Sequence, residues 1–396
     1  MKIGLISHSI YSSNLGCSAL AISNLRLMDE VFLEHSIPVE YVVILPESGQ
    51  NYDVKAFTSL EGYTKNPFTY REYPRPKKLL VMPWLLKTTR AFAGCDFVVD
   101  LCGGDGYTDN YGIKRIFAES IPVFGCKWNK IRCFFGPQTI GPFNTKVGQC
   151  VAKATLRRLN AIFVRDQSSY ECCKELGFIN KTIAVTDVAF ALPFERRSFC
   201  DGKMHIGVNV SGLLYNGGYD RKNYFGLSFS YKDYIHKLLE ILKEKPGVKI
   251  HLIPHVCYEY ADVDDDYSVC EQLKEAFPNV ILPERFKTAS EAKSYISAMT
   301  LFTGARMHAT IGAISSDVPV IPVAYSRKFN GLYDTLQYPF YIDAKADITV
   351  EQAIELFENY MNRMDEMRNG VAVAQNIYSQ KLKEYQHNLA NVFELR

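Results

Sequence analysis

The sequence lacks any apolar run close to the ~20 residues that a membrane-spanning helix requires. It also lacks a signal-peptide pattern, because Met1-Lys2 leads directly into the strand-like segment 3–7. Neither sign of charge prevails, since the formal net charge is +2. This near neutrality argues against the broad positive field that holds nucleic acid, so any basic feature must be local.

Cysteine is present but lacks the spacing that would give it a structural role. The chain has 11 cysteines, an odd number, and no C-x-x-C pair. This argues against both a disulfide framework and a structural zinc site. Cys172 and Cys173, adjacent in a helical pattern, are interpreted as small packing residues. Reduced thiols indicate a cytoplasmic location.

Two phosphate-binding motifs are also missing. The sequence contains neither G-x-G-x-x-G nor G-x-x-x-x-G-K-[ST]. A dinucleotide fingerprint and a P-loop are therefore excluded. NAD-dependent enzymes and P-loop kinases are therefore not among the leading candidates for the function of this protein.

The chain is long enough for two domains, since 396 residues exceed what one core usually serves. Strand and helix patterns alternate along most of it, which predicts parallel sheets. The alternation breaks at residues 193–204, which we interpret as a linker. We predict an α/β protein with two Rossmann-like domains whose parallel sheets face a cleft. The first domain spans residues 1–195, the second spans 203–370, and a helix at 371–396 packs back on the first.

The expected elements follow from hydrophobic periodicity. Strands are predicted at 3–7, 39–45, 97–101, 131–135, 161–164, 182–185, 205–210, 249–253, 280–282, 301–303 and 318–324. Helices are predicted at 17–34, 146–159, 168–176, 231–243, 267–276, 290–298, 309–315 and through most of 350–393. Residues 48–74 show no clear period and are expected to be loop or short irregular elements.

The stretch 301–328 carries the densest set of candidate functional residues. Arg306 and His308 lie where a short buried strand meets a helix, and Tyr325 and Lys328 follow the next strand. Helix N-termini favour anions, and ligands of open α/β sheets sit at the carboxyl ends of the strands. An isolated Arg or His at such a junction is more often an ordinary surface or capping group. Several together favour a small ligand rich in negative oxygen.

Strand ends of the first domain add further candidates. Asp105 stands in a glycine-rich turn that has an equal claim to being only a turn. Gln138 and Thr139 also stand in a turn that has an equal claim to being only a turn, although their amide and hydroxyl groups suit sugar hydroxyls. Arg165 is favoured as a ligand contact, whereas Asp166 is favoured as a helix cap.

The remaining candidates lie after other strands. Asn14 follows the first strand, Asn209 ends the strand at 205–210, and His255 is a weaker candidate. The acidic run 262–266 fails the spacing of a calcium loop, so we expect a solvated loop there.

One basic and apolar stretch, 77–86, is open to two interpretations. It could dock at a membrane surface, which would put the protein at the inner face of the membrane. Its apolar residues follow one another too closely to leave a polar face, and this favours core packing.

Taken together, these motifs resemble those of the polysaccharide pyruvyl transferase family. The features that match are Asn14-x-Gly16, the segment 96–105 (DFVVDLCGGD), 136–141 (GPQTIG), Arg165-Asp166, Asp187, Pro254-His255, Gly304-x-Arg306-Met307-His308 and Tyr325-x-x-Lys328. They span residues 3 to about 332. Cys17 departs from the pattern, because an acidic residue is common at that place, and this puts an acid role near residue 17 in doubt.

The resemblance implies a GT-B-like fold and a transferase. The donor would be phosphoenolpyruvate, and the acceptor would be a sugar of a capsule, an exopolysaccharide or another cell-surface polysaccharide, or its lipid-linked precursor. The pyruvyl group would become a cyclic ketal on two hydroxyls, with release of phosphate. The first domain would take the acceptor and the second the donor.

Within that implied reaction, each candidate receives a role. Arg306 and Lys328 would bind the donor anion, with Arg165 reaching across the cleft. His308 would transfer the proton, because imidazole exchanges protons near neutral pH. Asp105 is a weaker candidate for the acceptor base. No step demands a metal or another cofactor.

Two other functions remain open at this stage. A GT-B glycosyltransferase would use the same basic strand ends to hold the diphosphate of a nucleotide sugar. A non-catalytic glycan-binding protein would bind sugar without consuming phosphoenolpyruvate.

Overall fold

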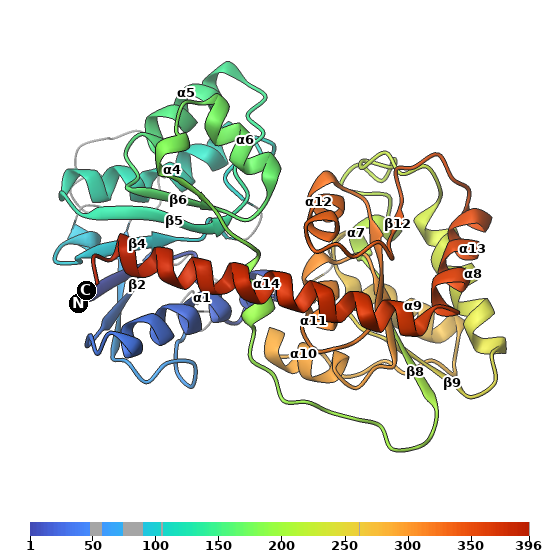
Figure 1. Cartoon of the computed structure of the whole chain (residues 1–396). Coiled ribbons are helices and arrows are strands. Elements are labelled where there is room, and N and C mark those ends of the chain that lie inside the picture. The colour runs from blue at the N-terminus through green and yellow to red at the C-terminus, as the bar shows by residue number, and fades with distance from the viewer. Residues whose placement is uncertain (48–57, 74–89, 104–105, 261, 396) are drawn as a thin grey trace. The chain divides into compact units, whose positions relative to one another are not determined.

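The computed structural model describes residues 1–47, 58–73, 90–103, 106–260 and 262–395 (Figure 1). The chain divides into two compact units. Unit 1 comprises Met1–Tyr11, Leu20–Ala191 and Gln380–Arg396, and unit 2 comprises Ser12–Ala19 and Leu192–Ser379. Each unit is therefore assembled from stretches that are far apart in the sequence.

Unit 1 is built on a seven-stranded parallel sheet with the order β3-β2-β1-β4-β5-β6-β7. Its strands are β1 Lys2–Ile6, β2 Glu40–Pro46, β3 Phe68–Tyr73, β4 Phe97–Asp100, β5 Arg132–Gln138, β6 Ala161–Val164 and β7 Thr182–Ala184. Its helices are α1 Leu15–Glu34, α4 Ile113–Trp128, α5 Lys146–Leu156 and α6 Gln167–Glu175, with short 3₁₀ turns at η1 Ile179–Lys181 and η2 Val188–Ala191. The first turn of α1 belongs to unit 2.

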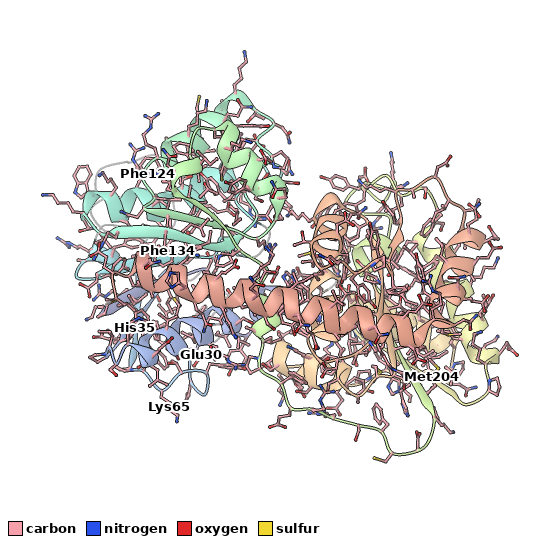
Figure 2. All side chains as sticks on the ribbon, in the orientation of Figure 1. Glu30, His35, Lys65, Phe124, Phe134 and Met204 are labelled. Carbon is pink, nitrogen blue, oxygen red and sulfur yellow. The ribbon has the colours of Figure 1, made fainter. Side chains whose placement is uncertain are left out.

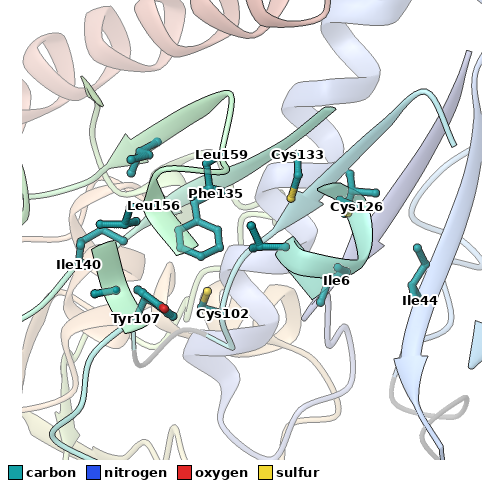
Figure 3. Packing of buried hydrophobic residues seen from close by; sticks show 14 of the residues in the cluster. Ile6, Ile44, Cys102, Tyr107, Cys126, Cys133, Phe135, Ile140, Leu156 and Leu159 are labelled. Atoms are coloured by element: carbon teal, nitrogen blue, oxygen red, sulfur yellow. The ribbon is translucent and has the colours of Figure 1, made fainter. Parts of the chain in front are cut away.

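The core of unit 1 packs apolar side chains from the strands and helices around β4 and β5 (Figure 3). Cys102, Cys126 and Cys133 are part of it and are buried among aromatic and aliphatic groups. All 11 cysteines are free thiols. In this core they act as small apolar side chains.

The last turns of α14, Met364–Val392, complete the same unit (Figure 1). The ring of Phe393 lies 4.8 Å from Phe32, 5.1 Å from Phe97 and 5.3 Å from Phe134, which is labelled in Figure 2. The hydroxyl of Tyr385 donates to Asn24 Oδ1 at 2.6 Å. Residues from both ends of the chain therefore share one core.

Unit 2 is built on a five-stranded parallel sheet with the order β12-β11-β10-β8-β9. Its strands are β8 Met204–Asn209, β9 Val248–Leu252, β10 Leu301–Gly304, β11 Val320–Ala324 and β12 Ile342–Asp343. Its helices are α7 Gly212–Tyr215, α8 Tyr231–Glu244, α9 Asp266–Ala276, α10 Ala289–Ile296, α11 Met307–Ile314, α12 Arg327–Thr335, α13 Val350–Met361 and the first part of α14. Within the described ranges, no helix is long and apolar enough to cross a membrane.

Most predicted strands and helices are present, and the exceptions have physical causes. β3 lies in the stretch 48–74, which was expected to be loop or short irregular elements. Its side chains are only partly buried, so it lacks a strong apolar signal, and pairing with β2 along its length defines it. The basic and apolar stretch at 77–86 lies outside the described residues.

Other elements also differ from the prediction, since α7, α12 and β12 were not predicted. Helix α4 was missed because Pro122 and Gly125 disfavour a helix locally, whereas packing against α5 supports one. The strand predicted at 280–282 is wrong. Only Ile281 pairs with the sheet, through a single bridge to His251.

The Tyr385 hydroxyl gives a first test of the core of unit 1. We expect Tyr385→Phe to lower the free energy of unfolding by about 1–3 kcal/mol, because the buried Asn24 Oδ1 loses its donor. Urea denaturation followed by circular dichroism measures the change. Tyr260→Phe is the control, because Tyr260 is 65% exposed. Equal stability of the two variants would contradict the role given to this hydrogen bond.

Candidate active site

The candidate site of unit 2 lies where β10 meets α11. The strand ends at Gly304, and the helix begins at Met307 with Arg306 as its N-cap residue. The Arg306 side chain makes no capping bond, so the guanidinium is directed elsewhere. The backbone N–H of Arg306 donates to Asn209 Oδ1 at 2.9 Å.

Asn209 holds three strand ends together. Its Oδ1 accepts from Arg306, and its Nδ2 donates to the carbonyl of Ile253 at 2.9 Å. The side chain is fully buried at the end of β8. A Cβ at Gly304 would lie only 2.6 Å from the Asn209 Cβ, so this close approach requires glycine. In this structure Asn209 aligns the junction that carries Arg306.

The guanidinium of Arg306 is clamped by two carboxylates. Nε donates to both oxygens of Asp266 at 3.1 and 3.2 Å. Nη2 donates to Asp264 Oδ1 and to Asp266 Oδ1, each at 2.5 Å. Burial opposes the charge of Arg306, but Asp266 and Asp264 outweigh it and raise its pKa well above the ordinary value.

Asp266 is the centre of this arrangement. It is fully buried, and it also accepts from the backbone N–H groups of Gly212, His255 and Val256 at 2.7, 3.0 and 3.0 Å. Asp265 caps α9 and Asp264 is 9% exposed, so the expectation of a solvated acidic loop is wrong here. The run supplies the counter-charge that a buried arginine needs. Burial, more than the opposing Arg306, raises the pKa of Asp264.

His308 lies in the first turn of α11, beside the segment 12–19. A Cβ at Gly16 would lie 2.3 Å from His308 Nδ1, so the imidazole packs directly on this glycine. Asn14 Oδ1 accepts from the backbone N–H of Gly16 at 3.0 Å and shapes the turn. Gly16 therefore leaves room for His308.

The segment 12–19 is fixed in unit 2 by backbone hydrogen bonds. Leu15 N donates to the carbonyl of His255 at 3.0 Å, and Cys257 N donates to the carbonyl of Ser13 at 2.8 Å. Asn14 and Val256 form an antiparallel bridge. Residues distant in sequence thus meet at the carboxyl end of β9.

Tyr325 and Lys328 follow β11, the neighbour of β10. Tyr325 is half-buried, and its ring lies 5.1 Å from Phe225. Lys328 is half-buried in the first turn of α12. The parallel register puts the ends of β10 and β11 at one edge of the sheet.

The predicted residues of unit 1 lie together at the ends of β5 and β6. Arg165 Nη1 donates to Asp187 Oδ2 at 2.9 Å, and its Nε donates to Thr139 Oγ1 at 3.3 Å. Both partners of the ion pair are buried, at 5% and 2% side-chain exposure. Asp166 caps α6, as predicted. Gln138 is buried beside the thiol of Cys102.

The predicted site residues are divided between the two units. Unit 2 holds Asn14, Asn209, Arg306, His308, Tyr325 and Lys328. Unit 1 holds Gln138, Thr139 and Arg165. Asp105 lies outside the described residues. In the part of the chain that the structure describes, no group of three or more His, Cys, Asp or Glu side chains forms a metal site.

Sequence reasoning missed Asp264 and Asp266 as members of the site. A signal was available, because a buried arginine at a strand end must find counter-ions. The acidic run follows Pro254-His255, which itself follows a strand of the same sheet. Sequence alone did not show that this run returns to Arg306.

The chain is similar to a known family in sequence and to solved structures in fold. The sequence profile described as polysaccharide pyruvyl transferase matches residues 14–327. Among curated proteins, none matches this chain in sequence.

Solved structures similar to this chain include a putative UDP-N-acetylglucosamine 2-epimerase from Listeria monocytogenes, with a TM-score of 0.61 and 11% identity, over 99% of this chain and 96% of that one. MnaA from S. aureus, solved with UDP, has a TM-score of 0.61 and 10% identity over 100% and 97%. MurG from Acinetobacter baumannii has a TM-score of 0.54 and 12% identity over 98% and 99%. At such identities the likeness shows the fold alone. It confirms the predicted GT-B-like α/β fold.

The clamp on Arg306 generates a prediction about stability. We expect Arg306→Ala to lower the free energy of unfolding by about 3–5 kcal/mol, because Asp266 and Asp264 would remain buried without their counter-charge. Chemical denaturation measures this loss. Lys237→Ala breaks an exposed ion pair with Glu351 and should leave stability nearly unchanged. Similar losses in the two variants would show that the clamp contributes little.

Proposed function

Because the chain belongs to the polysaccharide pyruvyl transferase family, we propose that it transfers the pyruvyl group of phosphoenolpyruvate to two hydroxyls of a sugar in a cell-surface polysaccharide or its lipid-linked precursor. The family is one of transferases that modify polysaccharides. The observation that carries the proposal is the match of residues 14–327, which includes the junction where His308 lies beside the Arg306 clamp. We place the enzyme in the cytoplasm, with peripheral membrane contact if the acceptor is lipid-linked.

The donor has a carboxylate and a phosphate, so its site must supply positive charge and N–H donors. The cluster of Arg306, Asp264 and Asp266 has a formal net charge of −1, because it combines one cation and two anions. Its hydrogen bonds use Nε and Nη2, and among the described residues none uses Nη1. We assign Nη1 to a substrate oxygen and Lys328 to the charge of the donor.

The reaction needs a proton at one carbon and a nucleophile at the next. His308 protonates C3 of phosphoenolpyruvate, and positive charge develops at C2. A first sugar hydroxyl adds to C2 and transfers its proton to His308, which is thereby protonated again. A second hydroxyl then displaces phosphate, which takes the second proton, and the ring closes as a ketal.

The acceptor side is assigned to unit 1. Gln138 and Thr139 lie at the end of β5 with amide and hydroxyl groups suited to sugar hydroxyls. Arg165, held by Asp187 and Thr139, is proposed to contact the substrate from that side. Asp105 remains the proposed acceptor base. We propose no metal and no cofactor besides the co-substrate.

A nucleotide-sugar glycosyltransferase is the second candidate. The observation that favours it is the fold, since MnaA of the same fold was solved with UDP. Thermal unfolding separates the two candidates. A rise of the midpoint with phosphoenolpyruvate supports pyruvyl transfer, and a rise with UDP alone supports the rival. A protein that binds glycans but neither donor would be a glycan-binding module.

For His308, we expect His308→Asn to reduce ketal formation by about 10²-fold or more, because the proton donor to C3 is lost. Phosphate release from phosphoenolpyruvate with a glycoside acceptor, together with mass spectrometry of the product, measures transfer. His236→Asn is the control, because His236 lies on α8 and bonds to Tyr215. Turnover that survives His308→Asn would remove this residue from proton transfer.

For Lys328, we expect Lys328→Ala to weaken phosphoenolpyruvate binding by about 10-fold to 100-fold, the equivalent of one lost charge-assisted hydrogen bond. The loss should shrink at high salt, because ions screen a half-buried charge. Isothermal titration calorimetry at two ionic strengths measures both effects, with Lys237→Ala as the control. Equal affinities for the wild type and Lys328→Ala would assign the donor anion to other groups.

A further inference from the structure

His255 lies at the carboxyl end of β9 with its backbone fixed on both sides. Its N–H donates to Asp266 Oδ2 at 3.0 Å, and its carbonyl accepts from Leu15 N at 3.0 Å. The same Asp266 clamps Arg306. The main chain of His255 is therefore tied directly to the candidate site.

The imidazole of His255 is in an unusual state for a buried group. Only 4% of the residue is exposed, and neither Nδ1 nor Nε2 has a hydrogen-bond partner among the described residues. Buried polar groups almost always have partners, because leaving one without a partner is costly. The described residues thus supply no hydrogen-bond partner to either ring nitrogen.

Other buried histidines of this protein show the contrast. His8 bonds to the carbonyl of Ile6 at 2.9 Å and to Asn24 at 3.1 Å. His251 bonds to His205 at 2.8 Å and to Tyr295 at 2.7 Å. Both use both ring nitrogens within the fold. A purely structural role for His255 would be expected to look the same.

The surroundings of His255 keep it neutral. Burial lowers its pKa to about 3, with smaller contributions from the neighbouring His308 and Arg306. The carboxylate of Asp266 accepts from its backbone N–H, not from its ring. A neutral imidazole has one N–H donor and one acceptor nitrogen. It can therefore donate a hydrogen bond to an oxyanion while it remains uncharged.

We propose that His255 is a ligand-contacting residue of the His308 site, whose neutral ring donates a hydrogen bond to an oxyanion of the donor substrate. Its other nitrogen accepts from a hydroxyl that enters with the ligands. His308 carries the proton, and His255 orients the anion. The identity of that anion as phosphoenolpyruvate rests on the proposed function.

The test uses substitutions that separate hydrogen bonding from packing. His255→Phe and His255→Leu both remove the two ring nitrogens. They put apolar side chains of two different sizes in the place of the imidazole. His255→Gln restores a neutral donor and acceptor. His251→Phe is the matched control, because it removes a buried histidine whose two partners belong to the fold.

We expect the apolar variants to unfold at or above the wild-type midpoint, because the two unmatched nitrogens are gone. Their affinity for phosphoenolpyruvate, measured by calorimetry, should fall about 10-fold, and His255→Gln should recover most of it. His251→Phe should show the reverse, with a lower midpoint and unchanged affinity. Equal affinity in wild type and both apolar variants would overturn the inference and leave a buried water as the partner. So would a lowered midpoint with unchanged affinity.

The same proteins distinguish a failure of the proposed function. If UDP and not phosphoenolpyruvate binds the wild type, pyruvyl transfer fails as the function, and the inference is judged on UDP. Loss of UDP affinity in the apolar variants supports it, and equal affinity overturns it. If neither probe binds, the midpoints decide. A lowered midpoint in both apolar variants overturns the inference, and a maintained or raised one supports it.

Discussion

The buried ion pair between Asp266 and Arg306 is the interaction on which the candidate site depends. A guanidinium at the end of β10 is buried only because two carboxylates compensate its charge. Asp266 in turn binds the backbone at Gly212, His255 and Val256. One carboxylate thereby sets the relative positions of the chain after β8, β9 and β10. Arg306 thus acts as a structural centre besides any contact with a substrate.

The fold could be predicted from the sequence because its strands are short apolar runs followed by glycine or polar turns. That pattern depends only on local composition, and parallel order follows from the alternation with helices. Elements that are defined by their neighbours could not be predicted from this local pattern. β3 depends on its pairing with β2, and α4 contains a proline that a local interpretation takes as a break.

The candidate site was predictable in part for the same reason. Arg306, His308, Tyr325 and Lys328 stand just after predicted strands, so their common edge follows from the topology. Asp264 and Asp266 could not be placed, because an acidic run has the same composition whether it is solvated or folded onto an arginine. The state of His255 likewise cannot be predicted from the sequence, since it is defined by the lack of a hydrogen-bond partner among the residues that the structure describes.

The membership of residues 12–19 in unit 2 has a consequence for how the protein is made. These residues leave the ribosome long before the segments around residues 255 and 308 that they contact, and unit 1 equally lacks residues 380–396 until they have been synthesised. A fragment cut at the linker would contain neither complete unit. Neither unit can therefore fold completely before its distant segments have been synthesised, and long-range closure rather than sequential domain folding should govern the folding rate.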